Sequence, residues 1–199
     1  MNDQKTTVDN QKMTADDTII AATRNWLVQA VIGLNLCPFA RAVYAGERIR
    51  YVVSGATTPA ALLEALAEEL RTLAAADEAV TETTLLIHPR VLGDFLDYND
   101  FLGLAEALVE DLGLDGVLQV ASFHPQYQFA DTEPDDVSNC SNRSPYPTLH
   151  LLRESSIERA VMTHPDTGQI YKNNIETLRR LGREGWARLG TDAPPVPEL

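Results

Sequence analysis

The residues best suited to chemistry lie in the stretch 121–154. It contains His124 and His150, together with Arg143, one of few cations in a very acidic chain. The stretch leaves a predicted strand and continues as a long polar loop, and loops of this length in compact domains are either functional or disordered. Four aromatic residues lie in it, which argues against disorder. We therefore expect the functional site here.

Two His-Pro pairs, at His88 and His124, each end a predicted strand. If these strands are parallel, their carboxyl ends meet at one edge of the sheet, where open α/β sheets bind ligands. Two imidazoles at that edge could act as acid and base or as metal ligands. The alternative is that each imidazole only binds a loop carbonyl. For His88 alone we favour this alternative, while keeping it as a candidate substrate-binding residue, and for His124 we favour function.

A helix predicted over 148–162 carries His150, Arg153 and Glu154, whose spacing lets them share one helix face. If that face meets the strand ends, His150 approaches His124. The two histidines are then candidate catalytic residues or metal ligands, and Arg153 is a candidate for binding the substrate. The alternative is a surface contact between His150 and Glu154.

Arg143 lies between Asn142 and Ser144. Its guanidinium presents a planar fork that matches a carboxylate or phosphate, and the two flanking side chains could add neutral hydrogen bonds. These three residues are therefore candidates for binding an anionic substrate. An alternative that we keep open is that Arg143 pins the loop against nearby acidic side chains.

Cys37 follows the predicted end of a helix and is a candidate nucleophile or metal ligand. A thiol serves as a nucleophile or metal ligand only when its thiolate is stabilised. The carboxyl terminus of a helix carries partial negative charge and destabilises a thiolate. An ordinary buried cysteine is the alternative, whereas Cys140 lies among polar residues and is expected to be exposed. No cysteine or histidine spacing matches a structural zinc site. The sequence identifies no cofactor, and a divalent metal at His124 and His150 is the one candidate.

The composition limits the partners of this chain of 199 residues. A net charge of −13 disfavours nucleic acid and anionic membranes. A group of arginines alternates with glutamates on a predicted helix and is expected to be a solvated face (Arg179, Arg180, Arg183 and Arg188). No apolar run is long enough for a bilayer, and residues 1–17 lack the apolar core of a signal peptide. Two distant cysteines indicate free thiols, so we expect a cytoplasmic protein with a small-molecule ligand.

Apolar periodicity predicts alternating elements: helices over 16–35, 57–75, 94–112, 148–162 and 169–187, and strands over 48–54, 83–88 and 116–123. This pattern indicates an α/β (or α+β) fold with a small mixed or parallel sheet of three or more strands flanked by helices. Ferredoxin-like connectivity is the alternative. We expect a disordered tail over 1–15, a single domain over 16–189 and a Pro-rich extended tail over 190–199.

Five strings resemble a bacterial domain-of-unknown-function family, numbered fourteen-fifteen: NLCPFA, TTLLIHP, DFLDYNDFL, LQVASFHPQYQFA and NRSPYPTLHLLRE. The resemblance covers nearly the whole chain after the amino-terminal tail. It implies a bacterial, cytoplasmic, single-domain protein, and the family has no established reaction. Asp131 stands where the family pattern has a glycine, so we expect this loop to be less free to adopt positive φ. Cys140 replaces an aromatic residue of the pattern, which weakens a metal role for it.

The first hypothesis is thus a small enzyme acting on a small, anionic metabolite, with acid–base or metal-assisted chemistry at histidines. The second is a non-catalytic protein in which the same loop binds a metabolite or another protein.

Overall fold

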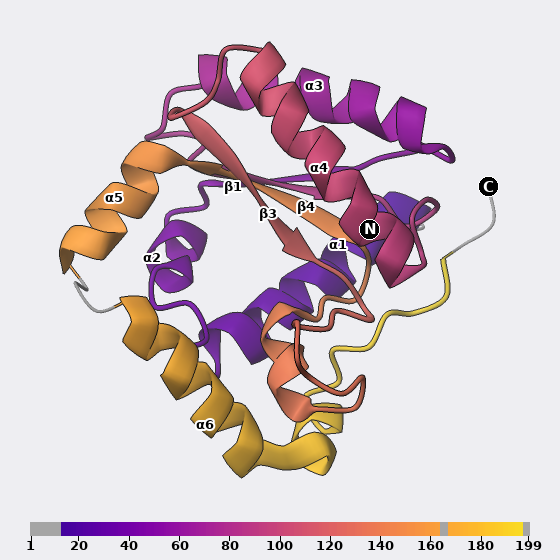
Figure 1. The fold of residues 1–199 in the computed structure, drawn as a ribbon, viewed down its shortest axis with the longest axis vertical. Helices are drawn as coiled ribbons and strands as arrows, with labels where there is room; N and C mark the ends of the chain where they lie inside the picture. Colours follow the sequence, from indigo (N-terminus) through magenta and orange to yellow (C-terminus); the bar gives the residue numbers. More distant parts are fainter. Residues whose placement is uncertain (1–12, 164–166, 197–199) are drawn as a thin grey trace, which may run out of the picture.

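The computed structural model describes residues 13–163 and 167–196. They form one sheet with helices on both faces (Figure 1). Its strands are β1 (Ile49–Val53), β2 (Thr83–Ile87), β3 (Leu118–Phe123) and β4 (Thr148–Arg153), in the order β1-β2-β4-β3. The helices are α1 (Ala15–Trp26), its π-helical continuation η1 (Leu27–Ile32), α2 (Ala40–Ala45), α3 (Pro59–Ala75), α4 (Phe95–Asp111), the 3₁₀-helix η2 (Val137–Asn142), α5 (Glu154–Thr163) and α6 (Thr167–Ala187). The predicted α/β class with a small mixed sheet is confirmed.

The strand directions decide which ends meet. β1 and β2 are parallel, and β4 is antiparallel to both β2 and β3. β1, β2 and β3 therefore run the same way, and their carboxyl ends share one edge of the sheet. The chain order β1-α3-β2-α4-β3 also differs from the β-α-β-β-α-β order of a ferredoxin-like fold.

One face of the sheet is covered by α3 and α4 (Figure 1). α3 begins where the Thr58 side chain accepts a hydrogen bond from the Ala61 amide and Pro59 occupies the first turn, as helix starts favour. Its apolar stripe is fully buried (Leu62, Leu66, Leu70 and Leu73). α4 is capped in the same way by Asp94. The stripe packs on alternate strand residues such as Leu86 and Leu149, and this contact forms the main core.

The opposite face of the sheet meets α1, η1, α2 and α5. Strand residues alternate between the two faces, so Leu85 and His150 point to this side while Leu86 and Leu149 point to α3 and α4. α1 starts at Ala15, because Thr14 forms a capping box with Asp17. The predicted helix start at residue 16 is therefore one residue too late. Among the described residues, no helix is long and apolar enough to cross a membrane.

Residues 148–153 form β4, so the helix predicted over 148–162 is wrong for this part. β4 lies between β2 and β3 and has neighbours on both faces, so its apolar residues do not alternate with polar ones. A short apolar run of this kind cannot be told from a buried helix by periodicity. α5 also starts directly at Glu154, without a Gly or Pro to mark the boundary. Because strand residues three apart point to opposite faces, His150 and Arg153 do not share a face.

The long loop folds back through η2, which packs against α6. Asp131 adopts a φ of 63° there, so the loop takes the positive φ that a glycine would adopt more readily. Most of the predicted tail 1–15 lies outside the described residues. The described part of the carboxyl-terminal tail is neither helix nor strand, and the Pro194 carbonyl accepts a hydrogen bond from the Tyr146 hydroxyl at 2.9 Å.

Candidate functional site: an apolar cavity beside the sheet

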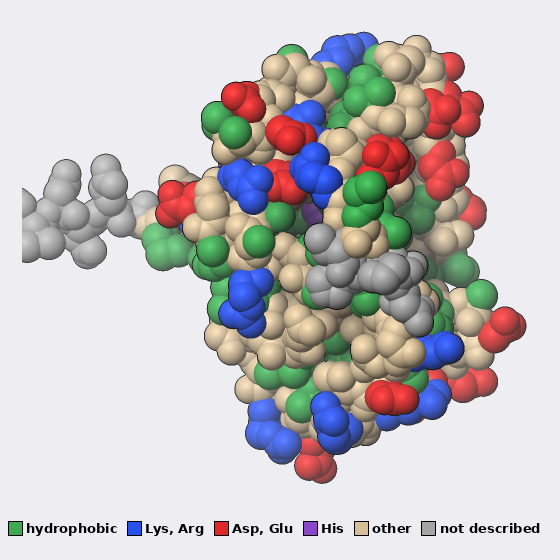
Figure 2. All heavy atoms as spheres, turned by 90° about the vertical axis from the view of Figure 1, so that its left-hand side faces the viewer, with side chains coloured by type: hydrophobic (Ala, Val, Ile, Leu, Met, Phe, Trp, Pro, Cys, Tyr) green, Lys and Arg blue, Asp and Glu red, His purple; other side chains and the backbone are tan. Residues whose placement is uncertain are grey.

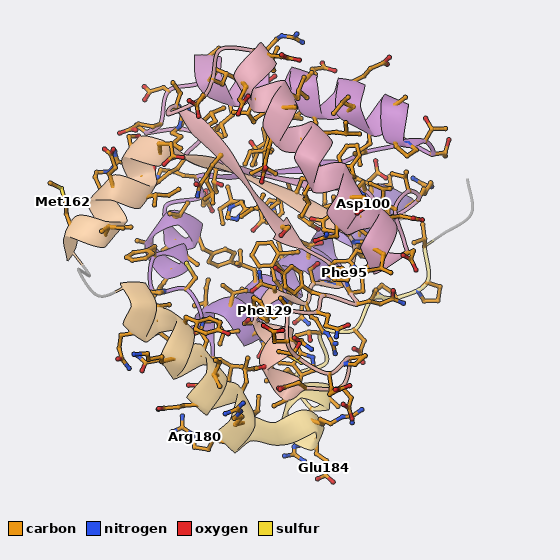
Figure 3. All side chains as sticks on the ribbon, viewed as in Figure 1. Phe95, Asp100, Phe129, Met162, Arg180 and Glu184 are labelled. Atoms are coloured by element: carbon orange, nitrogen blue, oxygen red, sulfur yellow. The ribbon has the colours of Figure 1, made fainter. Side chains whose placement is uncertain are left out.

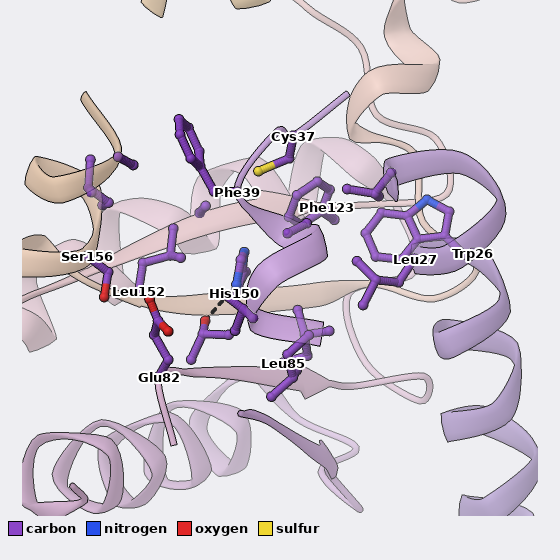
Figure 4. A pocket seen from close by; sticks show the side chains of 18 of the residues that line it. Trp26, Leu27, Cys37, Phe39, Glu82, Leu85, Phe123, His150, Leu152 and Ser156 are labelled. Atoms are coloured by element: carbon purple, nitrogen blue, oxygen red, sulfur yellow. Dashed lines mark hydrogen bonds between the residues drawn. The ribbon is translucent and has the colours of Figure 1, made fainter. Parts of the chain in front are cut away.

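A cavity of about 330 Å³ lies between the sheet and the layer formed by α1, η1, α2 and α5. Figure 4 shows it from close by, with His150 on the floor and Cys37, Phe39 and Trp26 around it. Most lining side chains are apolar, and the polar ones are Cys37, Glu82, Thr83, His150 and Ser156. No Lys or Arg is among the described lining residues. The cavity has the size and apolar walls of a small-molecule site.

His150 lies in the middle of the floor, paired across the sheet with Leu85 and Ala121. Its Nε2 is 2.7 Å from the Thr83 hydroxyl oxygen, which is 2.6 Å from the Leu151 carbonyl oxygen. A carbonyl oxygen can only accept, so the hydroxyl donates its one proton to Leu151. The hydroxyl must then accept from His150, and this places the imidazole proton on Nε2.

The other ring nitrogen, Nδ1, therefore carries a lone pair. Within the described chain, no hydrogen bond to this atom is present. Burial lowers the pKa of His150 to about 4, so the ring is neutral at pH 7. The floor of the cavity thus presents one neutral hydrogen-bond acceptor amid apolar side chains.

The charged residue at the cavity border, Glu82, is already paired. Arg48 forms an ion pair with one of its oxygens, and Arg159 of α5 lies 3.8 Å from the other. Its negative charge is therefore compensated by these arginines.

The cavity is partly open, and residues of α2 and α5 line it. Figure 2 shows this side of the molecule, where a hollow between charged side chains leaves a histidine visible. Of the histidines that the structure describes, His88 and His124 are fully buried and His150 is partly exposed. Of these three histidines, His150 is therefore the one that is accessible to solvent.

His88 and His124 meet at the shared carboxyl edge of β1, β2 and β3. Their rings lie against Tyr98 of α4, with centroid distances of 5.7 and 5.0 Å. His88 Nδ1 is 3.1 Å from the Val91 carbonyl oxygen, and His124 Nε2 is 3.1 Å from that of Leu92. Both imidazoles thus bind loop carbonyls, and both are 0% exposed. Burial lowers the pKa of each ring, so both are neutral at pH 7.

The sheet separates these two histidines from the cavity. His124 packs with the rings of α4, whereas His150 points to the other face. The structure therefore does not bring His124 and His150 into one site. In Figure 3, Phe95 and Phe129 point into the interior, while Met162 and Arg180 point outward. The Phe95 ring packs against His124, with a centroid distance of 5.5 Å.

Arg143, Asn142 and Ser144 use their donors on backbone carbonyls. Arg143 donates to the carbonyls of Tyr127 at 3.1 Å and Pro134 at 2.6 Å. Asn142 donates to a carbonyl of β3 at 3.3 Å, and Ser144 to a carbonyl two residues further on at 2.7 Å. The three residues hold the long loop in place and lie outside the cavity.

Arg153 lies on the α3 side of β4. One guanidinium nitrogen donates to the carbonyls of Leu73 and Ala76, each at 2.7 Å, and to that of Thr81 at 3.2 Å. Helix ends leave such carbonyls without partners inside the helix. Arg153 therefore satisfies the carboxyl terminus of α3 and the turn that follows.

The two cysteines have different surroundings, and both thiols are free, as predicted. Cys37 lies in the turn between η1 and α2 and lines the cavity. Cys140 is only 5% exposed, so its predicted exposure is wrong. Burial raises the pKa of the Cys140 thiol, which disfavours its thiolate.

A divalent metal has no suitable ligand set here. Within residues 13–163 and 167–196, no three His, Cys, Asp or Glu side chains are grouped so that they could hold an ion. His88, His124 and His150 each use a ring nitrogen in a hydrogen bond within the protein, and His150 lies on the other face of the sheet from the other two. The residues present therefore do not fit a metal centre.

Sequence reasoning missed Thr83 and the cavity itself. The cavity walls come from segments far apart in the chain, so no local motif marks them. The one available signal was alternation, since the positions two apart in each strand form the cavity floor.

The fold and the site together define a small α/β protein with an apolar cavity on one face of its sheet. The sequence profile of a family described as a protein of unknown function, DUF1415, matches residues 18–188. The chain belongs to this family, which confirms the resemblance drawn from the five strings. No curated protein and no solved structure matches the chain.

Proposed function

We propose that this protein binds a small, neutral and largely apolar molecule in the cavity beside His150. The observation that supports this proposal is a cavity of about 330 Å³ whose apolar walls surround one neutral imidazole. Apolar walls gain free energy when a ligand replaces water, and a few polar groups orient the ligand.

The chemistry of the walls favours a neutral ligand over the anionic metabolite that we expected from the sequence. An anion in an apolar cavity loses its hydration and needs a cation to compensate. Arg143 and Arg153 lie elsewhere, and the described lining offers no Lys or Arg. The proposal also involves no metal, because the side chains do not form a ligand set for one.

Filling the cavity tests the proposal. Ala121 lines the cavity next to His150, so Ala121→Phe should occupy the space of the ligand. Titration calorimetry with 1-methylnaphthalene should show saturable binding to the wild-type protein and at least a tenfold weaker affinity for the variant, equal to about 1.4 kcal/mol. Ala187→Phe adds the same ring at an exposed site of α6 and should bind normally. Equal affinities for the two variants, or no binding to the wild type, would contradict the proposal.

A second function, nucleophilic chemistry at Cys37, is favoured by one observation: Cys37 and His150 face the same cavity (Figure 4). The imidazole is held in one orientation by Thr83, as a base in a catalytic group is held by a third residue. We rank this second, because a histidine with a pKa of about 4 is a weak base and bases work best with a pKa near the working pH.

Thiol labelling tests the second function. We expect iodoacetamide to modify Cys37 faster than Cys140, because Cys37 is partly exposed in the cavity, whereas Cys140 is 5% exposed and burial raises the pKa of its thiol. Bound 1-methylnaphthalene should slow the modification. If His150 accepts the thiol proton, His150→Phe should lower the labelling rate of Cys37 on the order of tenfold. An unchanged rate in His150→Phe would reject the base role and leave the binding proposal intact.

A further inference from the structure

The hydrogen bonds around His150 also define the polar group of the ligand. We infer that the cavity selects molecules that carry a hydrogen-bond donor, such as a phenol or a hydroxylated ring, and discriminates against molecules whose only polar atom is an acceptor. This inference rests on the proposed binding function and adds the chemical class of the ligand.

The hydroxyl proton of Thr83 decides which ring nitrogen of His150 is protonated. Its hydroxyl lies 2.6 Å from the Leu151 carbonyl oxygen and 2.7 Å from His150 Nε2. Only one arrangement satisfies both contacts: Thr83 donates to Leu151 and accepts from Nε2–H. The Leu151 carbonyl of β4 thus sets the tautomer of His150 through the Thr83 hydroxyl.

The protonation of Nε2 determines which hydrogen-bonding group the cavity offers a ligand. A neutral ring protonated at Nε2 has a lone pair at Nδ1, and no described residue bonds to it. A donor such as a hydroxyl group can satisfy this lone pair. An ether or ketone oxygen would bring its own lone pair toward Nδ1, and this arrangement is repulsive.

The remaining polar groups of the cavity do not offer the same contact. Glu82 is paired with Arg48 at the border, and the Thr83 hydroxyl is already used in both directions. The hydroxyl of Ser156 and the thiol of Cys37 belong to the walls, away from the floor (Figure 4). His150 Nδ1 is therefore the acceptor that discriminates between ligands.

Three probes of one shape test the inference: 1-naphthol is a donor, 1-methoxynaphthalene is only an acceptor, and 1-methylnaphthalene is neither. A hydrogen bond to a buried group changes affinity on the order of tenfold. We expect 1-naphthol to bind about tenfold more tightly than 1-methylnaphthalene, with 1-methoxynaphthalene weakest. In His150→Phe, 1-naphthol should lose its advantage over 1-methylnaphthalene.

Thr83→Val provides the sharper test, because it removes the group that sets the tautomer and keeps the side-chain shape. Without Thr83, Nδ1–H can form, so the preference for 1-naphthol over 1-methoxynaphthalene should fall toward one. Thr83→Ser keeps the hydroxyl and should restore the preference. Thr84→Val is the matched control: Thr84 is the next residue, it is buried, and its hydroxyl has no described partner. This variant should discriminate like the wild type.

The outcomes separate the inference from the proposed function. If 1-methoxynaphthalene binds as tightly as 1-naphthol and Ala121→Phe blocks both, the donor rule is wrong and the binding function stands. If no probe binds the wild-type protein, both fail. Nitrogen-15 spectra of the unliganded protein give a check that needs no ligand and works even if Thr83→Val fails to fold. They should show His150 protonated at Nε2, and protonation at Nδ1 would overturn the inference.

Discussion

Lowering the pH from 7 to 4 is expected to reduce the free energy of unfolding by about 3 kcal/mol through His88 alone. Burial lowers the pKa of His88 in the folded protein to about 4, whereas an unfolded histidine titrates near pH 6.5. His150 has the same folded pKa and adds a comparable loss. Small domains have a total stability of only about 5–15 kcal/mol, so we expect the protein to be close to unfolding at pH 4.

The direction of the effect follows from which state binds protons. Above about pH 6.5 these histidines are neutral in both states, and they contribute no pH dependence. Between about pH 6.5 and 4 the unfolded chain binds protons that the folded protein does not, so stability falls as the pH falls. Below that range both states are protonated, and the loss is complete.

Urea unfolding between pH 7.5 and 4 measures this effect, and variants assign it. His88→Phe keeps a ring beside Tyr98 but cannot titrate, so the loss of stability on acidification should shrink by about 3 kcal/mol. Tyr98→Phe removes the hydrogen bond to the Thr148 carbonyl at 2.9 Å. It should lower stability at every pH and leave the pH dependence of the wild type unchanged. A profile for His88→Phe parallel to that of the wild type would show that His88 is not the cause.

Replacing Arg153 with methionine is expected to cost about 3 kcal/mol of stability at pH 7. The residue is 9% exposed, and one of its guanidinium nitrogens donates to three backbone carbonyls. Methionine fills much of the same space but donates no hydrogen bond. Leu73 and Ala76 at the end of α3 would then have buried or partly buried carbonyls without this donor. Each lost charged hydrogen bond typically costs about 1.5–3 kcal/mol.

Chemical denaturation of Arg153→Met and Arg188→Met separates this loss from that of an ordinary surface charge. Arg188 is an exposed arginine directly after α6, and it lies 3.8 Å from Glu184 of that helix. Such surface pairs contribute about 0–1 kcal/mol, so Arg188→Met should unfold close to the wild-type midpoint. Arg153→Met should also bind 1-methylnaphthalene normally when folded, because Arg153 is on the other face of the sheet. Reduced binding by a well-folded Arg153→Met would instead support the sequence-based role of Arg153 in the site.

Local patterns predicted most of the helices and strands correctly. Thr58 and Pro59 mark the start of α3, and Asp94 marks the start of α4. These are contacts within one helical turn, so the sequence contains all the information needed. β4 was missed because a strand buried on both faces shows no alternation. Its neighbours β2 and β3, which make it a strand, are distant in the chain.

For the site, the sequence correctly brought His88 and His124 to one edge of the sheet, because parallel strands end together. It could not show that both rings are enclosed by Tyr98 and the loop carbonyls. It also marked His150 and Cys37 as candidates, and these two line the cavity. Their partners in the site come from other strands and helices, beyond the reach of any spacing rule.

The sequence by itself thus determined the α/β class, the family and the positions of most helices, all of which depend on residues close together in the chain. Only the tertiary structure decided that His150 belongs to a strand, that it faces an apolar cavity and that Thr83 sets its proton. The physical reason is that strand pairing is non-local. The side chain of His150 is directed by hydrogen bonds to β2 and β3, and its partner Thr83 lies 67 residues away.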